Sequence, residues 1–174
     1  MTPQLFLYIT LRCSDFRIRK SSLGLIVSYI VEHRAINDKI ILNLFMKEAT
    51  NNWLAIAQKD LKIAEASLQA DEPLGVVFHL HAAVEKTLKA IYEETKGNPP
   101  KIHSLKKLAI DCCSIDLQQK ELQFLDILDK AFIDSRYPDD ITSFESRYNI
   151  SNCTELIKET KDTIKCLNSL LKKN

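Results

Sequence analysis

The chain has 174 residues, a formal net charge of +1 at pH 7 and 45% hydrophobic residues, so it can bury one substantial core and is too short to need two. It contains only three glycines and five prolines, which disfavours turn-rich β architectures and predicts an all-α fold. Residues 47–174 carry 18 Lys and Arg against 20 Asp and Glu, a balance that argues against a broad basic surface for duplex nucleic acid.

Residues 1–46 differ from the rest of the chain, because they hold four of the six arginines and show no sustained apolar period. The apolar segment 23–31 follows a basic segment, but it is too short to span a bilayer and charged residues follow it in place of a cleavage site. A regular helical pattern begins directly after Met46. We expect residues 1–46 to be a disordered leader or a mis-assigned start upstream of Met46, and 47–174 to form the folded domain.

The five cysteines are odd in number and form no CxxC pair. This usage is typical of reduced thiols in the cytoplasm, which is the expected location of the protein. Most of them lie on apolar helical stripes, so we interpret them as buried, unreactive side chains.

Beyond Met46, apolar residues recur at steps of three and four, and each such segment predicts a helix with one buried face. The segments are 47–69, 74–95, a shorter one from about Ser104, 117–135 and 152–172, with 136–150 expected to be a loop. Gly97, Asn98 and two prolines end the second helix. Because every helix has one apolar face, we predict an antiparallel up-and-down bundle of four to five helices.

The second helix carries most of the polar candidates. His79 and His81 are two residues apart and point about 200° away from each other on a helix, so they cannot share a metal ion without further ligands. No metal-binding motif occurs elsewhere, and we expect neither a metal nor a cofactor. By contrast, His81, Glu85 and Lys89 form one stripe, which is either a solvated ion pair or a polar groove between helices.

His103 precedes the predicted start of the third helix, where Ser104 can act as the cap. Its simpler role is to help the chain enter the helix. Its functional role would be an imidazole beside a substrate phosphate, because histidine exchanges protons near neutral pH.

Arg136 and Arg147 are the only arginines after Met46, and each stands in a Ser-Arg-Tyr tripeptide. The planar guanidinium suits phosphate or carboxylate, and the following tyrosine, Tyr137 in the first repeat, can stack on a base or pack against a helix. Arg136 can also simply stabilise the C-terminus of its helix, which Pro138 ends.

Four segments, in this order and separated by helical stretches, resemble the HEPN domain. They are "WLAIAQKDLKIAEASL" from Trp53, "FHLHAAVEKTLKAIY", "KIHSLKKL" and "SRYPDD", and the resemblance covers roughly residues 47–172. It implies a compact helical bundle that often forms a homodimer and acts on nucleotides or RNA. Many members are RNases of toxin–antitoxin and defence systems, others lack catalysis, and many are encoded beside a minimal nucleotidyltransferase partner.

The RNase members carry an arginine followed after four to six residues by a histidine. Neither Arg136 nor Arg147 has a histidine at that spacing, and no histidine follows His103. We therefore predict a non-catalytic domain that binds a nucleotide or a partner through His81, Glu85, Lys89, His103, Arg136, Tyr137 and Arg147. The alternatives are a metal-independent RNase that uses Arg136 and His103, and a helical scaffold without a ligand.

Overall fold

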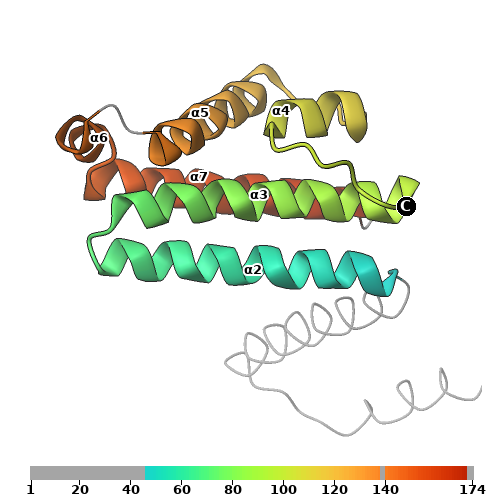
Figure 1. The fold of residues 1–174 in the computed structure, drawn as a ribbon. Coiled ribbons are helices and arrows are strands. Elements are labelled where there is room, and N and C mark those ends of the chain that lie inside the picture. The colour runs from blue at the N-terminus through green and yellow to red at the C-terminus, as the bar shows by residue number, and fades with distance from the viewer. Residues whose placement is uncertain (1–45, 138–139, 172–174) are drawn as a thin grey trace, which may run out of the picture. The chain divides into compact units, whose positions relative to one another are not determined.

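The computed structural model describes residues 46–137 and 140–171. The expectations for the leader therefore concern residues that, apart from Met46, lie outside the described ones. Within the described ranges the chain forms helices and no strand, so the all-α prediction is confirmed (Figure 1). The elements are α2 (Glu48–Gln69), α3 (Pro73–Lys96), α4 (Leu105–Lys107), η2 (Leu108–Cys112), α5 (Gln119–Arg136), α6 (Ile141–Arg147) and α7 (Ile150–Leu171).

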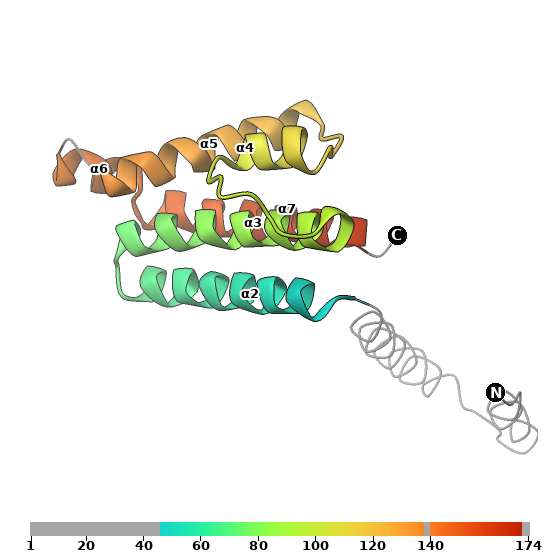
Figure 2. The same cartoon turned by 45° about the vertical axis from the view of Figure 1, so that its right-hand side comes forward.

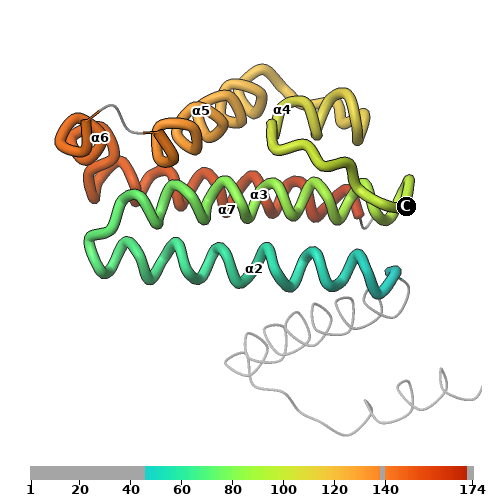
Figure 3. Tube along the Cα trace, in the orientation of Figure 1, coloured from blue at the N-terminus to red at the C-terminus, as the bar shows by residue number. Residues whose placement is uncertain are grey.

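The two long helices α2 and α3 form an antiparallel hairpin that runs the length of the domain (Figure 3). Asp71 makes the turn with a φ of 55°, in the left-handed region that aspartate tolerates better than most residues, and Pro73 starts α3 where no amide donor is needed. Gly75 allows the helices to approach closely, since a Cβ there would lie 2.7 Å from the Ser67 hydroxyl oxygen.

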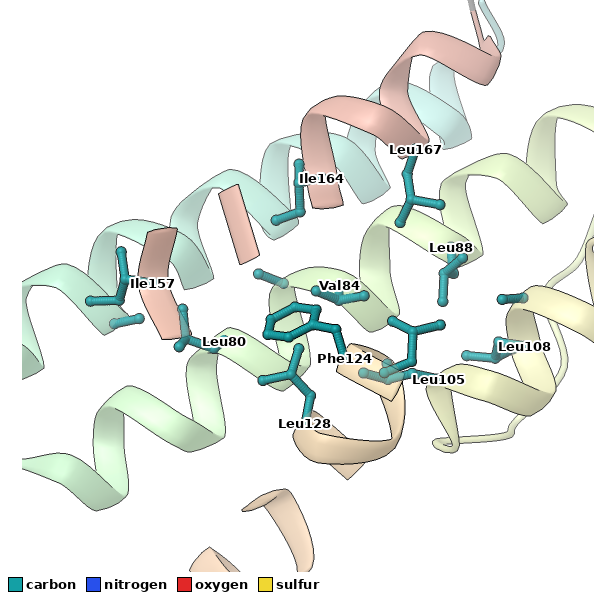
Figure 4. Packing of buried hydrophobic residues seen from close by; sticks show 14 of the residues in the cluster. Leu80, Val84, Leu88, Leu105, Leu108, Phe124, Leu128, Ile157, Ile164 and Leu167 are labelled. Atoms are coloured by element: carbon teal, nitrogen blue, oxygen red, sulfur yellow. The ribbon is translucent and has the colours of Figure 1, made fainter. Parts of the chain in front are cut away.

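Helix α3 is the central element. It packs against α2, α5 and α7 and against the short helical segments α4 and η2, and Figure 2 shows α2 and α5 on opposite sides of the layer that contains α3 and α7. Fully buried Leu80, Val84 and Leu88 of α3 lie in the core with Leu128 of α5 and Leu167 of α7 (Figure 4). The predicted bundle therefore forms because α3 presents apolar residues to several neighbours at once.

The third helix is short and changes geometry within two turns. Ser104 caps it as predicted, because its hydroxyl accepts a hydrogen bond from the Lys107 amide at 3.4 Å. The chain then continues as the wider π-helical turn η2, which ends at Cys112. Ser114, two residues later, has a φ of 56°. The segment that follows His103 is thus a compact turn of helix packed on α3 and α5.

The prediction that residues 136–150 form a loop is wrong, because this region contains α6. Asp140 caps α6 by accepting a hydrogen bond from the Ser143 amide at 2.8 Å. Phe144 is fully buried against Val77 of α3 and Ala131 of α5. A helix of seven residues with one buried side chain has no apolar period, so only the cap at Asp140 could have indicated it.

Among the helices in the described part of the chain, none combines the length and the apolar character needed to cross a membrane.

Candidate functional site

Three of the predicted site residues converge on the Glu85 carboxylate. The Lys89 ammonium lies 2.6 Å from Oε1, the His103 Nδ1 lies 3.1 Å from Oε2, and the His81 Nδ1 lies 3.9 Å from the same oxygen. The side chain of Glu85 is only 12% exposed, and both His81 and Lys89 are buried. The interpretation of this stripe as a solvated ion pair is therefore wrong: it is a polar seam inside the helical packing.

His103 is the exposed end of this seam, with 65% of its side chain accessible. A carboxylate oxygen accepts hydrogen bonds, so the Nδ1–H of His103 donates to Glu85, and whenever the imidazole is neutral its lone pair is on Nε2. Glu85 thus fixes both the tautomer and the orientation of an imidazole that solvent or a ligand can reach.

His81 has a different role, although it lies one turn from Glu85. Its side chain is 1% exposed, its Nε2–H donates to Asp129 at 3.0 Å, and its ring stacks almost parallel on Phe132 with 3.9 Å between ring centroids. The Nδ1 atom has no hydrogen-bond partner in the described residues. His81 therefore joins α3 to α5 and cannot itself contact a ligand in solvent.

Asp129 of α5 is the residue at this site that sequence reasoning missed. Its carboxylate accepts hydrogen bonds from His81, from the Leu105 amide at 2.9 Å and from the Ser104 hydroxyl at 2.9 Å. Partial burial by itself would raise the pKa of Asp129, but these hydrogen bonds and the charge of His81 outweigh it and lower the pKa below its usual value. No local pattern marks Asp129, because its partners come from two other parts of the chain.

Arg136 and Tyr137 lie at the end of α5, and both are exposed. The guanidinium carbon of Arg136 is 5.5 Å from the ring centroid of Phe132 and 5.6 Å from that of Tyr137. No carboxylate forms an ion pair with Arg136 in residues 46–137 and 140–171. Its planar group thus lies over aromatic rings, and no carboxylate among the described residues pairs with its hydrogen-bond donors.

The structure does not bring His103 and Arg136 into contact through any interaction of the described residues. Ser104, next to His103, is attached to α5 at Asp129. Asp129 and Arg136 are seven positions apart, which corresponds to a rise of about 10 Å along the helix. Ser104 is therefore joined to α5 about two helical turns before Arg136.

In the second Ser-Arg-Tyr tripeptide, the arginine and the tyrosine are both bonded to another residue of the domain. Arg147 lies 3.0 Å from Asp134, and the Tyr148 hydroxyl donates to the same carboxylate at 3.1 Å. Burial, followed by the negative charge of Asp134 and this hydrogen bond, raises the pKa of Tyr148 to about 12. Arg147 is therefore already paired, and it ties α6 to α5.

The remaining histidine of α3 belongs to a separate cluster. His79 donates from Nδ1 to Asp60 of α2 at 2.8 Å, and Lys86 pairs with the same carboxylate. His79 and His81 thus face different helices, as their spacing predicts. No group of three or more potential metal ligands occurs in the part of the chain that the structure describes.

The prediction of buried cysteines holds in part: Cys153 is buried and Cys112 and Cys113 are partly buried, but Cys166 is exposed. Burial is the main cause that raises the pKa of both Cys113 and Cys153 to about 11. Their thiols donate to the backbone carbonyls of Leu88 and Tyr148. Neither group is a thiolate at neutral pH.

The family model for the HEPN domain matches residues 50–170 of this chain. The chain belongs to the HEPN domain family. Among solved structures, the domain is similar to the crystal structure of TT1696 from Thermus thermophilus, with a TM-score of 0.62 and 22% sequence identity over 71% of this chain and 98% of that chain. A comparison with curated proteins found no match. At this level of identity, the likeness to TT1696 supports the helical fold.

The lowered pKa of Asp129 predicts how stability depends on pH. In the unfolded chain this carboxyl titrates near pH 4, so its contribution is complete above about pH 4 and is lost as the pH falls through the lower folded-state pKa. We expect the difference in unfolding free energy between the wild type and Asp129→Asn to shrink from about pH 6 to about pH 3, as measured by urea titrations.

Asp126→Asn is the matched control, since Asp126 is on the same helix, 53% exposed and paired only with Lys106 among described residues. A surface pair of this kind contributes little, so its effect should be small at every pH. Equal pH dependence for the two variants would show that the hydrogen bonds to Asp129 do not stabilise the fold.

Proposed function

We propose that this HEPN domain binds the phosphate of a nucleotide or of RNA through Arg136 and His103 and does not cleave it. The main support is the state of Arg136: an exposed guanidinium, positioned by aromatic rings and without a carboxylate partner in the described residues. Guanidinium groups form paired, charge-assisted hydrogen bonds with phosphate oxygens. His103, bonded to Glu85 of α3, offers a second polar contact beside the packing between α3 and α5.

The chemistry available in one chain favours binding over cleavage. Cleavage of RNA without a metal requires one group to remove a proton from the 2′-hydroxyl and another to protonate the leaving oxygen. Within the described residues, His103 is the only histidine with most of its side chain exposed, since His81 is buried and His79 is bonded to Asp60. The histidine that RNase members carry after the arginine is absent from this sequence.

The other predicted site residues support the ligand contacts indirectly in this proposal. Glu85 orients His103, while Lys89 neutralises Glu85 and lies 5.6 Å from the ring centroid of Trp53 on α2. Because Arg147 is paired with Asp134, we place it outside the ligand site. The contacting set is then His103, Arg136 and Tyr137.

Membership of the HEPN family supports two further parts of the proposal. The domain acts as a homodimer, and it pairs with a minimal nucleotidyltransferase in a module of the toxin–antitoxin type. Members of the family often have these associations, and the region where α5 ends and α6 begins presents Ile133 and Ile141, which are 59% and 45% exposed. Light scattering and co-purification with the neighbouring gene product measure the two associations directly.

A metal-independent RNase is the second candidate, and one observation favours it. The pair formed by Glu85 and His103 resembles the arrangement in which a carboxylate orients a catalytic imidazole and leaves its other nitrogen to exchange protons. In that case Arg136 would stabilise the charge on the phosphate.

Binding measurements test the role of Arg136. We expect Arg136→Ala to weaken the binding of ATP or of a labelled RNA oligonucleotide at least about tenfold, because a hydrogen bond to a charged group contributes about 1.5–3 kcal/mol. Fluorescence anisotropy with RNA and calorimetry with ATP measure this loss. Arg147→Ala is the matched control from the second Ser-Arg-Tyr tripeptide, and equal losses in both variants would contradict the proposed site.

Incubation with RNA distinguishes the two functions. We expect the purified wild-type protein to leave cellular RNA intact in the presence of EDTA, as seen on a denaturing gel. Degradation by the wild type that disappears in both Arg136→Ala and His103→Ala would instead establish the RNase. Protein that neither binds nor cleaves any of these ligands would support a helical scaffold.

A further inference from the structure

Near the end of α5, ring contacts and Arg136 link three aromatic residues, and we call Phe78, Phe132, Arg136 and Tyr137 together the aromatic platform. Phe78 from the first turns of α3 is 42% exposed, and its ring centroid lies 5.6 Å from that of Phe132 on α5. Arg136 lies over both Phe132 and Tyr137, and Tyr137 is 69% exposed. The sequence pattern indicated Arg136 and Tyr137 as ligand contacts, but neither Phe78 nor Phe132.

A buried contact holds Phe132 of the platform in place. The inner face of Phe132 stacks on His81 with an angle of 9° between the rings, and His81 is in turn bonded to Asp129. Phe132 therefore cannot turn without breaking a stack inside the packing of α3 on α5. A preorganised aromatic surface binds a flat ligand without the entropic cost of ordering its own side chains.

The aromatic rings and the guanidinium of the platform together indicate which kind of ligand it can bind. Exposed ring surfaces favour a flat, polarisable partner, and the guanidinium between two rings favours an anion beside it. A nucleobase joined to a phosphate supplies both, and base stacking on aromatic side chains tolerates any sequence. Bases inside a duplex have their faces covered, so the ligand must present an unpaired base.

The balance of charges in the domain also favours binding by stacking. With 18 basic and 20 acidic side chains in residues 47–174, the domain cannot rely on general attraction to the phosphate backbone. Affinity for a nucleic acid then depends on a few specific contacts, and stacking is the contact that the aromatic platform offers.

We propose that the aromatic platform of Phe78, Phe132, Arg136 and Tyr137 stacks an unpaired base of single-stranded RNA while Arg136 binds the adjacent phosphate. This inference rests on the proposed function and adds the base-stacking surface and the single-stranded nature of the ligand to it. Phe78 and Tyr137 contact the base, and His81 acts as a positioning residue through Phe132.

An abasic probe separates stacking from phosphate binding. Fluorescence anisotropy of the full chain is measured with three labelled probes: an oligoadenylate of about eight nucleotides, an abasic oligomer of the same length and charge, and the oligoadenylate in a duplex. We expect the wild type to bind the single-stranded oligoadenylate at least about fivefold more tightly than either other probe.

Variants of single residues show which side chains cause the preference for a probe that carries bases. Phe78→Ala should remove the preference for bases and leave the affinity for the abasic oligomer unchanged, whereas Arg136→Ala should weaken binding of both. Ile63→Ala is the matched control, because Ile63 is an apolar residue of α2 with 44% exposure, close to that of Phe78. Phe78→Leu, which retains apolar packing, replaces Phe78→Ala if circular dichroism shows that the alanine variant is unfolded.

The outcomes distinguish this inference from the proposed function. Equal affinity of the wild type for the oligoadenylate and the abasic oligomer overturns the stacking surface but leaves phosphate binding intact. Binding to neither probe, and to no nucleotide, overturns both proposals. A Phe78→Ala variant that loses dimerisation and keeps the preference for bases shows that the aromatic platform contacts a second copy of the chain, which also overturns the inference.

Discussion

The arrangement of this domain depends on the Asp129 carboxylate, which accepts hydrogen bonds from three groups in two other segments. Its bond to buried His81 joins α5 to the central helix α3, and its bonds to Ser104 and Leu105 attach the start of α4. A buried imidazole without such a partner would cost stability, so Asp129 makes a polar residue compatible with the core. The same bonds determine where His103 and Phe132 lie.

Two carboxylates thus connect the interior to the exposed candidate site. Glu85 holds His103 in place, with Lys89 balancing its charge, and Asp129 holds His81 against Phe132. His103 is therefore oriented by a partly buried carboxylate, and Phe132 by the buried ring of His81. Of the polar groups in this region, His103 before α4 and Arg136 at the end of α5 are exposed.

The long helices and the membership of the HEPN family were predictable from the sequence, because apolar periodicity and four ordered motifs extend over most of the chain. The short helix α6 was not, since one buried residue, Phe144, makes no period. The sequence also left open whether Lys89 is solvated: charged residues at helical spacing usually face solvent, but this one is buried and lies beside Trp53 of α2.

By itself, the sequence determined the long helices and the list of chemical groups, including the absence of a histidine after Arg136. These are properties of local spacing and of composition. Only the tertiary structure decided which of those groups meet: that His103 is bonded to Glu85, that Arg147 is paired with Asp134 while Arg136 lies between aromatic rings, and that Asp129 joins three segments. Such pairings depend on how the helices pack and on which side chains become buried. Neither can be derived from the spacing of residues along the chain.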